Sequence, residues 1–200
     1  MSASHSFLRT KQKEIYKFYS VVSFLKVVNN KSMNKFLTTI LIFSFFVSVQ
    51  ASDDILDRKK YLKSALGVSE LPMHKYLIIK DDVEDGIYEI MKDSYHTPVI
   101  KYWKVGDKVA FILEAIGKHE FITTGYLVEN NQISDAKVIT YRENYGYEVK
   151  YDYFINQIKG NSLKTSNKLS KKLANISGAT MSVNSMRKLS KLSLFLYSKI

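Results

Sequence analysis

The stretch VIKYWKVGDKVAFILEAIGKHEFITTGYLVENNQISDAKVITY, residues 99–141, is dense in Val, Ile, Tyr, Phe and Thr, the residues that fit best on a pleated strand. Three turn-forming pairs interrupt it: Gly106-Asp107, Gly117-Lys118 and Asn130-Asn131. Each run between these turns shows some apolar and polar alternation, as expected of a sheet with one covered face. The stretch therefore predicts an antiparallel meander of four strands, over Val99–Lys104, Lys108–Ile116, Glu120–Val128 and Gln132–Tyr141.

Helical patterns lie on both sides of this meander. Their periodicity predicts helices over Ser52–Ser69, Asp81–Met91, Val149–Ile158 and Ser182–Ser198. The last is amphipathic, because apolar side chains recur at steps of three or four from Val183 to Leu196. Gly160 is placed to end the third helix. The pattern predicts an α+β fold in which helices pack on one face of an antiparallel sheet.

Several kinds of metal and redox centre are excluded by composition, because the 200 residues include no cysteine. A disulfide framework, a Cys-ligated iron–sulfur cluster and a CxxCH haem site all require cysteine. The histidines His74, His96 and His119 are far apart in the sequence and lack the spacing of metal ligands, so no metal site is predicted.

An uncharged run of 14 residues, FLTTILIFSFFVSV, occupies Phe36 to Val49. It follows Met33-Asn34-Lys35 and precedes the small residue Ala51, an arrangement typical of a secretory signal peptide. A transmembrane helix needs about 20 apolar residues, so this run is short for one. We expect residues 33–51 to be a signal peptide cleaved after Ala51, and the protein to be periplasmic or otherwise extracytoplasmic. An uncleaved membrane anchor is the alternative.

Residues 1–32 are basic and aromatic and have the character of neither a domain nor a linker. Because signal peptides begin near the initiator methionine, we expect Met33 to be the true start and residues 1–32 to be a spurious extension. Residues 1–51 hold seven of the 30 basic residues and one of the 19 acidic residues, so the rest carries a net charge of +5 instead of +11. These charges are scattered, and no nucleic-acid partner is expected.

The segment NISGATMS, Asn175 to Ser182, enters the predicted final helix. Gly178 lets the backbone approach a ligand closely. The hydroxyls of Ser177, Thr180 and Ser182 surround the start of the helix, where free N–H groups and the helix dipole favour an anion. From these residues alone, the segment is either a phosphate-binding loop or an ordinary helix N-cap.

The six residues from Ser177 to Ser182, SGATMS, resemble the flavinylation motif Ser/Thr-Gly-Ala-Thr-x-Ser/Thr of the FMN-binding domain family. That family includes flavin-carrying components of two membrane assemblies, the sodium-pumping NADH:quinone reductase and the Rnf electron-transport complex. Residues 125–147 are similar to the family's strand–turn–strand with the Glu and Gly that follow it, and residues 154–160 resemble its short helix ending in Gly. The resemblance extends over about residues 100–195.

The resemblance implies that FMN is the cofactor and is joined through its phosphate to the Thr180 hydroxyl. A flavin transferase that uses FAD and a divalent metal would make this link. Residues 99–200 would be the FMN-binding domain, after a helical N-terminal part over 52–98. The cofactor-binding residues carried over are Thr180, Ser177, Gly178, Ala179, Ser182, Glu143 and Gly146. Asn144-Tyr145-Gly146 departs from the Thr-Pro-Gly of many members, which bears on the surroundings of the flavin.

The resemblance implies an electron carrier in preference to a stand-alone enzyme. The expected partner is a redox protein, which can be membrane-bound. Two alternatives stay open: a non-redox binding domain in the same compartment, and the flavin subunit of a reductase. Tyr145 or Tyr147 is expected against the isoalloxazine ring. The lysines between Lys159 and Lys172 are expected to lie in a solvated loop or to dock an acidic redox partner.

Overall fold

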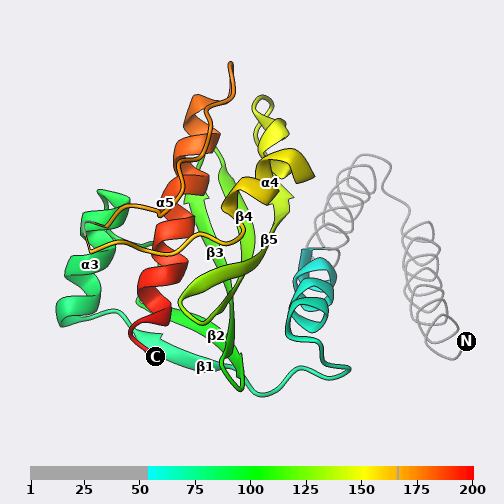
Figure 1. Ribbon diagram of the computed structural model, residues 1–200, viewed down its shortest axis with the longest axis vertical. Coiled ribbons are helices and arrows are strands. Elements are labelled where there is room, and N and C mark those ends of the chain that lie inside the picture. Colours follow the sequence, from blue (N-terminus) through cyan, green and yellow to red (C-terminus); the bar gives the residue numbers. More distant parts are fainter. Residues whose placement is uncertain (1–53, 166) are drawn as a thin grey trace, which may run out of the picture. The chain divides into compact units, whose positions relative to one another are not determined.

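A five-stranded antiparallel sheet is the centre of the fold (Figure 1). The computed structural model describes residues 54–165 and 167–200, so the predicted signal peptide and the residues before it lie outside the described part. The strands follow one another across the sheet in chain order. They are β1 (Lys75–Ile78), β2 (Val99–Val105), β3 (Lys108–Ile116), β4 (Phe121–Glu129) and β5 (Gln132–Tyr141).

The predicted meander is confirmed, with strand ends that differ by at most one residue. The turn at Asn130 and Asn131 has positive φ at both residues, 52° and 59°, as a tight two-residue hairpin requires. Strand β1 was not predicted from the sequence. It has only four residues and forms an edge of the sheet, where most of its side chains are exposed and leave no alternating pattern.

The helices are α3 (Asp81–Met91), α4 (Asp152–Ile158) and α5 (Thr180–Tyr197), with a helical segment over residues 54–66. The prediction of one helix over 149–158 is wrong. A 3-10 turn, η1 (Tyr147–Lys150), comes first, and Tyr151 then has an extended backbone that separates it from α4. Helix α5 starts two residues before its predicted start, which places Thr180 in its first turn.

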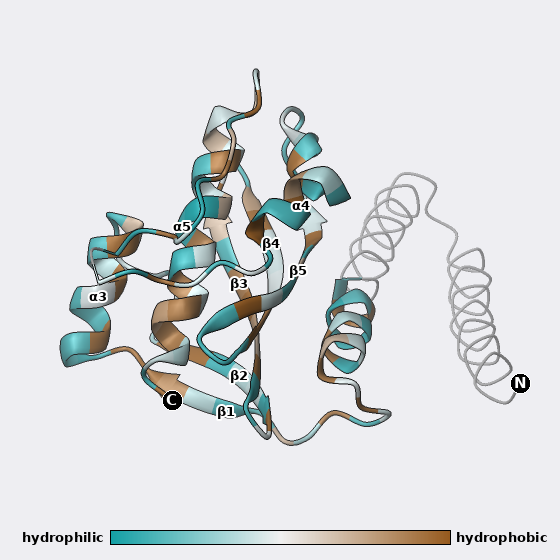
Figure 2. Cartoon of the chain, viewed as in Figure 1, coloured by the Kyte–Doolittle hydropathy of each residue, from teal (hydrophilic) through white to brown (hydrophobic). Residues whose placement is uncertain are grey.

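Helices cover both faces of the sheet, which corrects the expectation that they pack on one. On one face, α5 and α3 enclose the larger core, to which β3 contributes Val109, Phe111 and Leu113. On the other face, Tyr61 and Leu62 of segment 54–66 pack on strand residues that alternate with those of the larger core, such as Ala110. Figure 2 shows the apolar residues along the strands and the alternation of apolar and polar residues along α5.

The reason for the second covered face lies in the strand sequences. The run VAFIL in β3 is apolar without interruption, which is typical of a strand buried on both faces. Gly125 of β4 makes room for the helical segment, because a Cβ atom there would lie 2.1 Å from Cε1 of Tyr61. Among the described residues, no helix has the length and apolar character needed to cross a membrane.

Candidate functional site

The start of α5 is the first wall of the candidate site. Ala179 is the N-cap residue, and no side chain makes a capping hydrogen bond there. The first N–H groups of a helix have no partner within the helix. The first turn of α5 also contains no acidic residue. The positive end of the helix dipole is therefore not neutralised by a side chain of that turn, and it favours an anion.

Thr180 is exposed at this helix start. Its Oγ1 accepts a hydrogen bond from Nδ2 of Asn175, at 3.2 Å. Because Asn175 is the donor, the Thr180 hydroxyl proton is not used in this bond. Gly178 precedes it with φ of +80°, a conformation that favours glycine, and a Cβ atom there would meet nothing within 4 Å. The space beside Gly178, next to Thr180, is therefore open.

The loop after β5 is the second wall, and it is held against α5 by Tyr141. The Tyr141 hydroxyl donates to the carbonyl oxygen of Tyr145 at 2.6 Å and lies 2.9 Å from Oγ of Ser182. Gly146 has φ of +84°, and a Cβ atom there would lie 2.7 Å from Ser182 Oγ and 3.3 Å from Ala179 Cβ. A glycine is needed at this point because of both the backbone conformation and the close approach.

Glu143 connects this second wall to a third, the turn between β3 and β4. Its Oε1 accepts hydrogen bonds from three successive backbone N–H groups: Lys118, His119 at 2.6 Å and Glu120 at 2.9 Å. Partial burial acts to raise the pKa of Glu143, but these N–H groups outweigh it, and the pKa is lowered. The charged carboxylate therefore fastens the end of β5 to the turn.

These three walls enclose a cavity of about 440 Å³, which lies within the range of roughly 300–1,000 Å³ common for small-molecule sites. Its lining consists of Lys118, His119, Glu143, Asn144, Tyr145, Gly178, Ala179, Thr180, Met181 and Ser182. Lys118 adds a positive charge. Tyr145 and Met181, 81% and 52% exposed, give the cavity an open apolar edge.

Five of the seven residues predicted for the site line this cavity, whereas Ser177 and Gly146 do not. Ser182 is buried, and its hydroxyl contacts Tyr141. Of the two tyrosines expected near the ring, Tyr145 lines the cavity and Tyr147 does not. The sequence analysis missed Lys118, His119, Asn144 and Met181. Lys118 and His119 belong to the β3–β4 turn, which the carboxylate of Glu143 holds beside the cavity. No local sequence pattern reveals this long-range contact.

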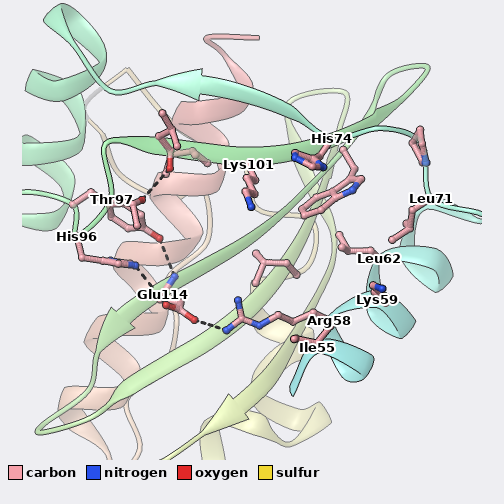
Figure 3. A pocket seen from close by; sticks show the side chains of 16 residues that line it. Ile55, Arg58, Lys59, Leu62, Leu71, His74, His96, Thr97, Lys101 and Glu114 are labelled. Carbon is pink, nitrogen blue, oxygen red and sulfur yellow. Dashed lines mark hydrogen bonds and ion pairs between the residues drawn. The ribbon is translucent and has the colours of Figure 1, made fainter. Parts of the chain in front are cut away.

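A larger cavity, of about 580 Å³, lies on the opposite face of the sheet between segment 54–66 and strands β2 and β3 (Figure 3). Glu114 is its polar centre, with Oε1 2.7 Å from Nη2 of Arg58 and Oε2 3.5 Å from Nε2 of His96. No residue of segment 175–182 lines it. Within the described ranges, no group of three or more His, Cys, Asp or Glu could hold a metal ion.

Sequence comparison relates the smaller cavity to a known protein family. The model of one protein family, the FMN-binding domain, matches residues 117–194. The matched segment begins at the β3–β4 turn and ends within α5, so it contains all three walls of the smaller cavity. The chain carries an FMN-binding domain. The resemblance expected from the SGATMS segment is therefore confirmed.

The fold of the FMN-binding domain agrees with this result. The crystal structure of NqrC from Shewanella oneidensis superposes with a TM-score of 0.52 and 16% sequence identity, over 74% of this chain and 93% of that chain. At this level of identity, the likeness concerns the fold. A search of curated proteins found no match.

The cavity walls of the FMN-binding domain fit the two ends of FMN. The uncapped start of α5 and Lys118 suit a phosphate group. The apolar side chains of Tyr145 and Met181 suit a flat aromatic ring. The residues present therefore fit the cofactor that the family binds.

The variant Glu143→Gln tests the contact between the second and third walls. The amide keeps the shape and one oxygen acceptor but removes the charge. We expect a more positive midpoint potential of bound FMN, because a carboxylate near the ring makes it harder to add negative charge there. We also expect lower thermal stability at neutral pH, because a carboxyl with a lowered pKa stabilises the fold when charged.

The stability difference between wild type and Glu143→Gln should be full at neutral pH and should vanish as the pH falls through the lowered pKa of the folded Glu143 carboxyl. Potentiometric titration of the two FMN-bound proteins and thermal unfolding at a series of pH values measure these effects. A lower stability with an unchanged potential would mean that Glu143 only fastens the turn.

Proposed function

We propose that FMN is attached to this protein through a phosphoester with Thr180 Oγ1, and that the flavinylated protein carries electrons in an extracytoplasmic redox chain. The observation that carries the proposal is the exposed Thr180 hydroxyl at the uncapped start of α5, inside the cavity of an FMN-binding domain. An attached phosphate would lie where the helix dipole stabilises it.

The attachment reaction takes FAD as donor and needs a flavin transferase with a divalent metal. Thr180 Oγ1 forms a bond to the phosphorus of the FMN half, the phosphoanhydride bond breaks, and AMP leaves. The hydroxyl proton is released. Asn175 supports this role, because its amide donates to Thr180 Oγ1 and so orients the oxygen without using its proton.

Bound FMN supplies reversible electron transfer, and the residues around it would hold it and limit its contact with water. Tyr145 and Met181 lie at the open edge of the cavity, where a partner protein could come close to the ring. A carrier needs this access and no substrate pocket of its own. The expected partner is a redox protein, which can belong to a membrane complex.

Anaerobic titration of the flavinylated protein with dithionite tests the carrier function. We expect the flavin absorbance to bleach and to return on addition of ferricyanide, without net consumption of a small substrate. A protein purified without flavin from a host that contains a flavin transferase would favour the non-redox binding domain. Catalytic turnover of a small acceptor would favour the reductase function.

Export is tested by the N-terminus of the mature protein. We expect the sequence to begin at Ser52, because the residues before it form the predicted signal peptide. N-terminal sequencing of protein recovered from the periplasm measures this. Membrane-bound protein that still contains Phe36–Val49 would show an uncleaved anchor instead.

A further inference from the structure

The larger cavity, of about 580 Å³, has no part in the proposed function, since no residue of segment 175–182 lines it. Its walls come from segment 54–66, from the two loops that precede β1 and β2, and from strands β2 and β3 (Figure 3). Its volume lies within the range of about 300–1,000 Å³ that is common for small-molecule sites. The cavity is therefore large enough to admit a ligand of its own.

One part of the cavity wall is apolar. Leu62 is buried in the small core between segment 54–66 and the sheet, whereas Leu71, Trp103 and Ile112 pack against that core and remain partly exposed. All four line the cavity. A half-buried indole ring beside aliphatic side chains offers a flat apolar surface, which suits the ring of an aromatic ligand.

The charged side chains of the lining are mostly basic. Arg58, Lys59 and Lys101 are positively charged at neutral pH, and Glu114 is the only acidic residue among the described residues that line the cavity. Within the described part of the chain, neither lysine has a carboxylate oxygen within 4.0 Å of its ammonium nitrogen. The lining therefore has a net positive charge, and its two lysines are left without an acidic partner there.

Glu114 does not oppose this positive charge, because both of its oxygens are engaged. Its Oε1 accepts hydrogen bonds from Nη2 of Arg58 at 2.7 Å and from Oγ1 of Thr123 at 2.8 Å. Nε2 of His96 lies 3.5 Å from its Oε2. Figure 3 shows Arg58 and Lys59 on the side of segment 54–66 and Lys101 on the side of the strands. The two lysines therefore approach the cavity from different walls.

We propose that this cavity binds a small organic anion with an aromatic body, such as an aryl carboxylate. The ring would lie against Trp103 and its aliphatic neighbours, and the carboxylate would lie at Lys59 and Lys101. A cationic ligand would be repelled by these two charges, and a neutral ligand would gain nothing from them. An inorganic anion would leave the apolar wall uncovered. The site is separate from Thr180 and does not depend on FMN attachment.

The test uses Trp103, the only tryptophan of the chain, as a local probe. In a nitrogen–proton correlation NMR spectrum of isotope-labelled protein it gives the only indole N–H peak, which reports on the apolar wall of the cavity. The ligands are 2-naphthoate and 2-naphthamide, which have nearly the same shape but differ in charge. The double variant Lys59→Gln, Lys101→Gln removes the two lysines of the lining. The control Lys60→Gln, Lys104→Gln changes the net charge equally at neighbouring lysines outside the lining.

We expect 2-naphthoate to shift the indole peak saturably in wild type. Its Kd should rise about threefold to tenfold in the first double variant, because two solvent-exposed ionic contacts are lost. The control should keep Kd within about twofold of wild type. In wild type, 2-naphthamide should bind more weakly than 2-naphthoate, and the two double variants should bind it equally.

The dispersion of the backbone peaks in the same spectra checks that both double variants fold. The proposal is overturned if 2-naphthoate leaves the indole peak of wild type unmoved, or if wild type binds the two ligands equally well. It is also overturned if the Kd for 2-naphthoate is unchanged in the first double variant or rises equally in both. None of these measurements involves flavin, so each outcome leaves the proposed attachment at Thr180 unaffected.

Discussion

Thr180→Val is expected to abolish the flavin that stays on the chain after denaturation. Valine has nearly the shape of threonine but lacks the hydroxyl that forms the phosphoester. Thr180 is exposed and makes one side-chain hydrogen bond, from Asn175, so the fold should lose no more than about 0.5 kcal/mol. In-gel flavin fluorescence of chains coexpressed with a flavin transferase measures the effect, and thermal unfolding measures the stability.

Two further variants separate the hydroxyl of Thr180 from the rest of the motif. Ser177→Ala removes an exposed hydroxyl that does not line the cavity, and it should leave the bound flavin unchanged. Thr180→Ser keeps a hydroxyl and should keep part of the flavinylation. If Thr180→Val still holds flavin in a denaturing gel, the attachment residue is elsewhere.

Gly146→Ala is expected to destabilise the protein strongly and to impair flavinylation. A left-handed backbone costs an alanine about 1–2 kcal/mol. The new Cβ atom would also lie 2.7 Å from Ser182 Oγ and 2.9 Å from the Tyr141 hydroxyl, and such overpacking costs about 1–3 kcal/mol. The contact that holds the second wall against α5 would be displaced.

Gly106→Ala is the matched control. Gly106 also has a positive φ, +59°, but a Cβ atom there would meet nothing within 4 Å. Urea unfolding should therefore show a loss of about 1–2 kcal/mol for Gly106→Ala, from the backbone alone, and about 2–5 kcal/mol for Gly146→Ala. Equal losses in the two variants, with normal flavinylation of both, would contradict a role for Gly146 in closing the site.

Features fixed by neighbouring residues were predictable from the sequence. The strands β2 to β5 follow from β-forming residues between turn signals, and Asn130-Asn131 is the clearest of these signals. The anion-favouring start of α5 follows from Gly178 and the small residues around it. The helix break at Tyr151 was missed, because a 3-10 turn followed by an α-helix gives nearly the same spacing of apolar residues as one helix.

Features that depend on tertiary contacts were not predictable. Glu143 was expected beside the flavin, and the structure adds that its carboxylate is occupied by the N–H groups of the β3–β4 turn. Ser182 belongs to the motif, yet its hydroxyl contacts Tyr141 inside the fold. The second covered face of the sheet depends on the fit of Tyr61 over Gly125, two residues that are distant in the chain.

The most direct test of the central claim is peptide mass spectrometry of the protein coexpressed with a flavin transferase in an exporting host. Trypsin should release Leu173–Arg187, which contains Thr180. We expect this peptide to gain the mass of FMN less one water, with fragment ions that place the gain on Thr180. An unmodified Leu173–Arg187 peptide, or the same mass gain on another residue, would contradict covalent attachment of FMN at Thr180.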